Sequence, residues 1–594
     1  MKKEFESRAG HFKKTSEQLS RKHSLIAVFR ILIFVLSVIF VFYFANERDY
    51  VALAVTVFLF PVPFGFLVNY HNKIAYQRNQ AKFISQINEE EIVRLDGELK
   101  SFDEGVDFFD NGHAYTSDLD VFGKNSLFQL ISRATTPSGR NVLAEWFKAS
   151  AVKEEILDRQ NAVKELAPQL EWRQGFQASG MHHNKDKSIE KLTSWLEEEN
   201  QISKPGFKQS IAIALTVIAL GVIVYSIIAN ITFSFVLLAL LTNGIFLGKY
   251  LKYSKEVSEK ISKISELLAS YVSLISLIEA SNFQSKKLIT LKSSFENEGK
   301  TASKEIKKLE KLLDHFDRRA NPFYLFYSIL LNLDVHRLVQ VEQWRINNRE
   351  NIQKWFESIG QFEVLCSYAA YSYANPDTTF PEISEDRFEF SSKDLGHPLI
   401  QSEKRVKNDF EIKGEGTITL ITGSNMSGKS TFLRTVGVNM VLASSGATVS
   451  AKSVKTSVVQ LFTGMRSADD LDEGISSFYA ELKRIQQLLK LVEDSEIPVM
   501  FMLDEILKGT NSKDRHKGAE ALVRQLSKTQ SFGFVSTHDL ELAKLAKELD
   551  TVKNKSFNSS IKDDEIIFDY KITEGACHSF NASELMKKIG IKIQ

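Results

Sequence analysis

Two stretches of the chain are unusually long and apolar, and they limit the fold more than any other feature. Ser210 to Gly248 contains no charged side chain and is long enough for two membrane-spanning helices. Leu25 to Ala45 is apolar except for one arginine, and Val51 to Val68 is uncharged. Only helices and closed barrels satisfy their backbone polar groups in lipid, so the pattern predicts two transmembrane helical hairpins, over residues 25–69 and 210–248.

Basic residues precede the first helix and follow the second helix of each predicted hairpin, and these two ends lie on the same side of the membrane. By the positive-inside rule, such flanks stay in the cytoplasm. We therefore expect a multi-pass protein of the cytoplasmic (inner) membrane, with residues 1–24 and every soluble domain in the cytoplasm. Buried core helices are the alternative, but a core helix is seldom apolar on all sides. The flanking residues are Lys13, Lys14, Arg21, Lys22, Lys73, Arg78, Lys82, Lys204, Lys208, Lys249, Lys252 and Lys255.

The soluble part divides into two helical segments and one α/β unit. Residues 83–202 and 251–373 have helical apolar spacing, and Thr136 to Gly139 predicts the turn that opens one of these helices. Residues 374–400 predict a linker. The α/β unit then occupies residues 401–594.

Composition narrows the possible partners. The formal net charge of +1 gives no overall attraction to nucleic acid, so any DNA contact depends on local groups. Two isolated cysteines, Cys366 and Cys577, argue against a zinc site or a disulfide framework.

Heptad-like runs over Glu256 to Leu313 favour extended helices or a coiled coil. The lysines there form a solvated helix face or contact DNA, and they include Lys304, Lys307, Lys308 and Lys311.

The stretch ITGSNMSGKST, from Ile421 to Thr431, fits G-x-x-x-x-G-K-[ST] between a β-prone and a helix-compatible segment. Backbone N–H groups of such a loop point at phosphate oxygens. Lys429 is expected to reach the β- and γ-phosphates of ATP, and Ser430 to hold Mg²⁺. The expected ATP-binding residues of the loop are Gly423, Ser424, Asn425, Met426, Ser427, Gly428, Lys429, Ser430 and Thr431.

Two further apolar strands end in residues suited to ATP hydrolysis. Ile497 to Glu505 (IPVMFMLDE) ends in an acid pair, in which Asp504 is expected to orient Mg²⁺ and Glu505 to polarise the attacking water. The strand in GFVSTHD ends at His538, which is placed to sense the γ-phosphate. The three segments together predict a P-loop ATPase.

An amphipathic helix is predicted between the P-loop and the acid pair. Its apolar face consists of Phe478, Leu482, Ile485 and Leu489. Ser476 and Ser477 lie where this helix begins, and two interpretations stay open. They cap their own helix, or they offer N–H groups and a hydroxyl to a phosphate, also across a dimer interface.

Five stretches together resemble the ATPase motifs of the MutS family of DNA mismatch-repair proteins. They are TGSNMSGKST, ADDLDEGISSF, LDEILKGTNSKD, STHD and EGACHSFNASELMKKIG. Upstream, LDVFGKNSLFQLISRATTPSGRNVLAEWF resembles the start of the family's helical core. The expected fold is an α/β P-loop NTPase domain of the ABC/MutS type, joined to an all-α MutS-like core and the two transmembrane hairpins.

The resemblance implies a homodimer with composite ATP sites and helical levers that contact DNA. Ser476 of one protomer would complete a site formed by the partner's copies of Asn425, Lys429, Asp504, Glu505 and His538. The family's usual aromatic residue before the P-loop is not evident, and Tyr570 is the candidate to stack on adenine. We do not expect the family's N-terminal mismatch-reading and connector domains in this chain, because a predicted membrane hairpin takes their place. We therefore expect a membrane-anchored ATPase that binds DNA without strong preference for a mismatch.

Two other functions fit part of the pattern. An ABC-like transporter or extrusion component would need an LSGGQ-type signature, which is missing, and more than about four spans. An ATP-gated membrane scaffold would bind a protein partner and never touch DNA. The sequence does not separate this scaffold from a DNA-binding ATPase, because the helical middle has no decisive basic stripe.

Overall fold

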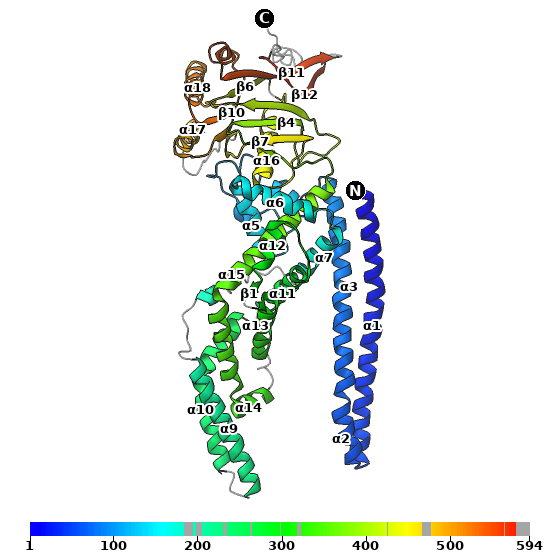
Figure 1. Ribbon diagram of the computed structural model, residues 1–594. Coiled ribbons are helices and arrows are strands. Elements are labelled where there is room, and N and C mark those ends of the chain that lie inside the picture. Colours follow the sequence, from blue (N-terminus) through cyan, green and yellow to red (C-terminus); the bar gives the residue numbers. More distant parts are fainter. Residues whose placement is uncertain are drawn as a thin grey trace.

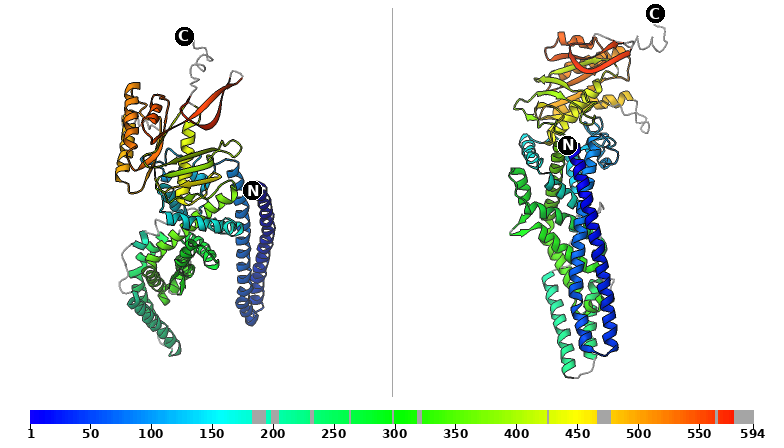
Figure 2. Two further views of the ribbon diagram at one scale, coloured as in Figure 1. Left: turned by 45° about the horizontal axis from the view of Figure 1, so that its top comes forward. Right: turned by 90° about the vertical axis from the view of Figure 1, so that its right-hand side faces the viewer.

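The computed structural model describes residues 1–182, 194–197, 205–229, 234–261, 264–297, 299–317, 322–424, 426–465, 477–562 and 565–577. A domain with two β-sheets lies at one end and a helical core lies in the middle (Figure 1). Two long helical hairpins extend from the core in the same direction, away from the sheets (Figures 1 and 2).

The N-terminal hairpin consists of α1 (Lys2–Asn46), α2 (Tyr50–Leu59) and α3 (Pro61–Leu95). Asp49 caps α2 by accepting a hydrogen bond from Ala52 N at 3.0 Å. The predicted span from Val51 to Val68 is divided between α2 and α3, because Pro61 lacks the N–H that a continuous helix needs. Phe60 keeps helical angles (φ −60°, ψ −40°), so α3 continues in the direction of α2.

Three helices of the described residues are long and apolar enough to cross a membrane, judged by length and composition. They are α1, α9 (Pro205–Ile228) and α10 (Ser234–Ile261), the last over Ser234–Val257. Most of their apolar side chains are exposed. The fourth predicted span, divided at Pro61, is not among them and stays a prediction. A short apolar helix, α14 (Pro322–Leu331), lies against α9 and α10.

The described residues of the two predicted helical segments are largely helical, except for residues 96–126, which contain only η1. The heptad-like region forms several separate helices. Its parts α11, α12 and α13 are separate, with the short strands β1 (Glu296–Asn297) and β2 (Lys300–Thr301) before α13. The predicted turn at Thr136 is confirmed, since its side chain accepts from Gly139 N at 3.2 Å at the start of α5. The core elements are η1 (Val106–Phe108), α4 (Leu127–Ile131), α5 (Pro137–Lys148), α6 (Lys153–Leu166), α7 (Leu170–Gly180), α11 (Ile264–Ala280), α12 (Lys286–Ser293), α13 (Ala302–Asp317) and α15 (Leu333–Ala374).

The longest core helix, α15, has 42 residues and no proline, so it extends about 63 Å. Its buried Glu363 accepts hydrogen bonds from the backbone N–H groups of Thr135 (2.7 Å) and Thr136 (3.1 Å). Gly360 lets α5 approach, because a Cβ there would lie 2.7 Å from the carbonyl oxygen of Ser138. These contacts fix the start of α5 on α15.

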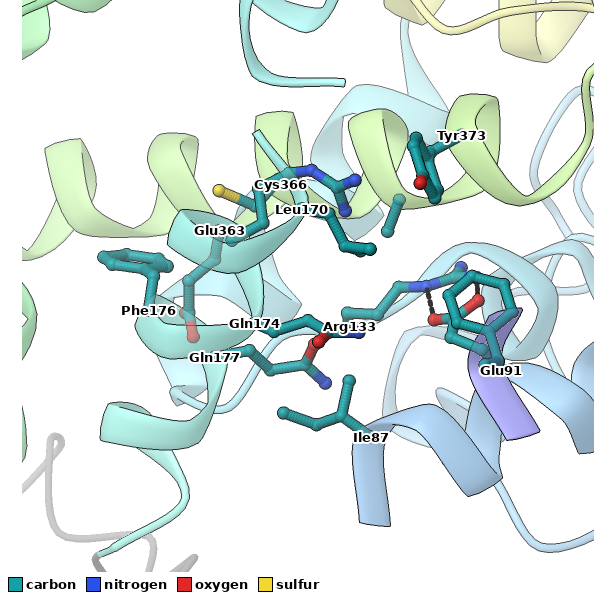
Figure 3. A pocket seen from close by; sticks show the side chains of 13 residues that line it. Ile87, Glu91, Arg133, Leu170, Gln174, Phe176, Gln177, Glu363, Cys366 and Tyr373 are labelled. Atoms are coloured by element: carbon teal, nitrogen blue, oxygen red, sulfur yellow. Dashed lines mark hydrogen bonds and ion pairs between the residues drawn. The ribbon is translucent and has the colours of Figure 1, made fainter. Parts of the chain in front are cut away.

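A buried ion pair joins the N-terminal hairpin to the core. Arg133, just before α5, donates through Nε and Nη2 to both carboxylate oxygens of Glu91 on α3, at 2.9 and 2.8 Å (Figure 3). Both side chains are almost fully buried. Removing one partner would leave an uncompensated buried charge, so this pair resists separation of the hairpin from the core.

The β-domain contains two sheets. The larger has the order β12-β11-β6-β10-β9-β8, in which β11, β6, β10, β9 and β8 are parallel and β12 is an antiparallel edge strand. The smaller has the order β3-β7-β4-β5. The strands are β3 (Glu382–Ile383), β4 (Glu389–Leu395), β5 (Asn408–Lys413), β6 (Ile418–Gly423), β7 (Ser453–Thr456), β8 (Gln460–Gly464), β9 (Val499–Asp504), β10 (Ser531–Thr537), β11 (Val552–Lys562) and β12 (Glu565–Glu574). The helices are α16 (Lys429–Ser445), α17 (Ser477–Asp494), α18 (Ser512–Leu526) and η3 (Leu542–Lys547).

The linker expected over residues 374–400 is largely part of this domain. Strands β3 and β4 lie within it, and β4 pairs with both β5 and β7. Its Pro and Asp residues mark turns between short strands instead of an extended connection. One buried hydrophobic cluster continues from the helical core into α16 and the larger sheet, so the two parts share a core.

Candidate functional site

The predicted catalytic segments meet at one edge of the larger sheet. β6, β10 and β9 are adjacent and parallel, so their carboxyl ends lie side by side. The P-loop follows β6, His538 follows β10, and the acid pair ends β9. Ligands of open α/β sheets bind at this edge, outside the carboxyl ends of the strands.

The P-loop holds its lysine in a buried position. Lys429 is 4% exposed, and its ammonium donates to the carbonyl oxygens of Gly423 (3.0 Å) and Ser424 (2.9 Å). Burial lowers the pKa of Lys429, and the nearby Glu505 carboxylate raises it. Ser430 and Thr431 are exposed in the first turn of α16, which begins at Lys429.

The loop has the features of a phosphate cradle. Gly428 adopts φ +103°, a left-handed conformation that only glycine takes readily. Met426 also has a positive φ (+68°), with its side chain 83% exposed. The Ser427 hydroxyl is buried and has no hydrogen-bond partner among the described residues. An unsatisfied donor beside a glycine turn at a helix N-terminus fits the phosphate oxygens of a nucleotide.

The acid pair is held by groups from the neighbouring strand. Ser536 donates its hydroxyl to Asp504, and Glu505 N donates to Ser536 O at 3.1 Å. The Glu505 carboxylate lies 2.5 Å from His538 Nε2 and 3.0 Å from Lys508 Nζ. The His538 hydrogen bond lowers the pKa of Glu505 to about 2, although partial burial acts in the opposite direction. Lys429 Nζ is 4.0 Å from the same carboxylate.

Helix α17 is tied to the segment that follows the acid pair. Its Glu481 accepts hydrogen bonds from Leu507 N and from Lys508 N, the latter at 3.1 Å. A Cβ at Gly509 would lie 2.6 Å from the Cβ of Phe478, so this glycine permits the close contact. Of the predicted apolar face, Phe478, Ile485 and Leu489 pack on the core and Leu482 is 40% exposed.

Tyr570 lies beside the P-loop. Its ring would be 3.0 Å from a Cβ at Gly428 and stacks loosely on Phe568, with 6.2 Å between centroids. Asn408 donates to the Tyr570 carbonyl at 3.0 Å and so fixes this part of β12. The candidate for stacking on adenine therefore lies next to the P-loop, and the stacking itself stays a prediction.

Some predicted residues lie outside the described ranges, and some neighbours were not predicted. Asn425 and Ser476 belong to the first group. Lys508, Ser536 and Glu481 are the neighbours that were not predicted, although Ser536 lies inside the STHD motif and could have been found from it.

Within the described ranges, no group of three or more His, Cys, Asp or Glu side chains is placed to hold a metal ion. Mg²⁺ in nucleotide sites needs few protein ligands because it keeps water and phosphate oxygens, so Ser430 and Asp504 fit it.

The parallel sheet, the glycine-rich loop at the start of α16 and the acid pair define a P-loop ATPase-type domain. Residues 419–591 match the family model of MutS domain V. The protein named "DNA mismatch repair protein MutS" from Thermotoga sp. is 34% identical over 248 residues, which are 41% of this chain and 30% of the relative. The protein of the same name from Acetivibrio thermocellus is 30% identical over 269 residues, 44% of this chain and 30% of the relative.

Residues 419–591 are therefore a MutS-type domain V, which confirms the family predicted from the motifs. The aligned region spans only about 30% of the length of these curated relatives.

Proposed function

We propose that this chain is a membrane-anchored, dimeric ATPase that binds and hydrolyses ATP with Mg²⁺ and contacts DNA at the cytoplasmic face of the membrane. The observation that carries the proposal is the convergence of Lys429, Glu505 and His538 at one edge of the domain V sheet.

Each group at this edge has a distinct task. Residues 423–431 bind the phosphates through backbone N–H groups, and Lys429 neutralises charge on the β- and γ-phosphates. Ser430 and Asp504 hold Mg²⁺, which supplies positive charge to the phosphoryl oxygens when bound. Glu505 orients and polarises the attacking water. His538 fixes the Glu505 carboxylate and senses the γ-phosphate, and Tyr570 stacks on adenine.

The proposed anchor consists of the two hairpins. It is supported by the three apolar helices, by their exposed side chains and by the basic flanks on the side of the ATPase domain. A reporter fused after Gln594 or inserted near Asn111 is expected in the cytoplasm, and a tag at Asn230 outside. A reporter at Asn111 that reports the outer face would contradict this topology.

Contact with DNA is proposed from the domain V match, because the aligned relatives carry mismatch repair in their names. We expect these contacts to go to phosphates and to be independent of base pairing. Purified full-length protein in detergent should retain duplex DNA in an ATP-dependent and salt-sensitive way. A preference for mismatched over matched duplex above about tenfold, or roughly 1.4 kcal/mol, would reveal a mispair reader.

The alternative is an ATP-gated membrane scaffold for a protein partner. The same experiment separates it, because a scaffold would hydrolyse ATP and retain no DNA at any salt concentration. No described feature favours a transporter.

A further inference from the structure

A large basic groove lies between α13 and α15, outside the ATP site. Its volume is about 910 Å³, and the start of α9 contributes to one end. Six cationic side chains line it, against a single acid, Glu305. The cations are Lys300, Lys304, Lys307, Lys308, Lys311 and Arg337.

Both walls of the groove carry hydrogen-bond donors, ammonium groups on one wall and side-chain amides on the other. The five lysines follow one face of the β2–α13 segment, and within the described residues none of them forms an ion pair. The facing stripe of α15 carries the amides of Gln340, Gln343, Asn347, Asn348 and Asn351. Asn348 also donates to Glu305 at 3.5 Å, which engages the only acid. Ammonium and amide N–H groups in this arrangement match phosphate oxygens.

One end of the groove lies at the level where the second hairpin becomes apolar. Gln209 lines it and directly precedes Ser210, the first residue of the uncharged span. The start of α15 is attached to the same hairpin, since Asn332 donates to Thr216 at 3.4 Å. Arg337 lies five residues further along α15, which is about 7.5 Å along the helix axis from this contact.

Apolar surface continues below the groove. Asn243 of α10 donates to Leu330 O at 3.1 Å, which places the end of α14 against α10. Tyr327 on α14 is 53% exposed. The cations and amides of the groove match the phosphate head group of an amphiphile. The apolar side chains next to the groove match its hydrocarbon part.

The geometry points to a binding site for the head group of an anionic phospholipid in the groove between α13 and α15. This inference rests on the proposed membrane anchor. The sequence left the lysines of α13 as a solvated face or a DNA contact, and the position of the groove at the end of the span favours lipid. Its cations suit a head group with more than one negative charge, such as that of cardiolipin.

The test measures binding of cardiolipin to full-length protein in detergent by native mass spectrometry, with phosphatidylcholine, inorganic pyrophosphate and a short DNA duplex as comparison ligands. Lys307→Gln/Lys308→Gln should weaken cardiolipin binding roughly fivefold for each lysine and about thirtyfold together. Lys304→Gln/Lys311→Gln on the same wall is the second variant, in case the first fails to fold. Lys513→Gln/Lys517→Gln on α18 removes the same charge from exposed positions and should leave binding unchanged.

Three results would overturn the inference. The first is unchanged cardiolipin binding in both groove variants. The second is a loss of DNA affinity with cardiolipin binding retained, which would identify a nucleic-acid site. The third is pyrophosphate binding that is as tight as cardiolipin binding and is weakened equally by the groove variants, which would identify a site for soluble phosphates. Membrane fractionation of the wild type tests the anchor separately, because lipid binding in detergent does not require the chain to be membrane-inserted.

Discussion

The Glu505 carboxylate contacts the imidazole of His538 and the ammonium of Lys508. With a pKa of about 2, it stays ionised throughout the physiological range. Such an acidic group is a weak proton acceptor, so in the proposed mechanism Glu505 would act mainly by orienting water and stabilising developing positive charge. Its backbone adopts φ +52°, a strained conformation that aims the side chain across the strand ends.

Glu505→Gln should separate binding from hydrolysis. The amide has nearly the same shape but no charge, so ATP turnover should fall by roughly 10²–10⁴-fold while nucleotide affinity changes little. Lys429→Ala should instead weaken nucleotide binding, because it removes the buried ammonium of the P-loop. Turnover assays and binding of a fluorescent nucleotide measure the two effects. Equal turnover by Glu505→Gln and wild type would remove Glu505 from the mechanism.

His538→Asn should shift the acid side of the pH profile. It removes the largest cause that lowers the pKa of Glu505, while burial continues to raise it. Glu505 then takes up its proton at higher pH, and turnover should begin to fall at a higher pH than in the wild type. The measurement is turnover from about pH 3 to 8, normalised to each plateau, because a carboxyl group whose pKa rises from about 2 titrates at the acid end of this range. Superimposable acid limbs would refute the coupling.

At the scale of elements, α17 and the segment after β9 act as one unit. Glu481→Ala removes the acceptor for two backbone N–H groups and should lower the free energy of unfolding by about 1–3 kcal/mol. Turnover should fall with it, since the freed segment begins next to Glu505. Glu481→Gln retains one acceptor oxygen and should show a smaller loss. The exposed Glu493→Ala on the same helix is the control, and an equal effect there would contradict the assignment.

The strands of the ATPase domain could be predicted because their apolar runs end in motif residues of fixed spacing. For that reason Lys429, Asp504, Glu505 and His538 could be assigned to strand ends, which the structure brings together at one edge, and their roles in ATP hydrolysis stay predictions. The strands β3 and β4 were missed, since short edge segments with turn residues resemble a linker. Lys508 and Glu481 were missed as well, because their contacts depend on the positive φ angles of Glu505 and Leu507. The break at Pro61 was visible in the sequence, but its effect on the span was not.

At the scale of the whole molecule, the proposed dimer makes a mixing experiment informative. A Lys429→Ala chain combined with a Ser476→Arg chain should recover one intact composite site in each heterodimer. Partial ATP turnover should then appear that neither homodimer shows. Turnover of the mixture equal to the average of the two separate variants would mean that each site is complete within one chain.

Helix α15 begins beside the second hairpin and ends where the chain enters the β-domain (Figure 1). Because it is a single rod about 63 Å long, it converts small angles into large displacements. A tilt of about 5° at the β-domain end would move the far end sideways by roughly 5 Å, a distance equal to the rise of about one helical turn. In the proposed membrane anchor, a movement at the ATP site would therefore push α9 and α10 sideways against the surrounding lipids.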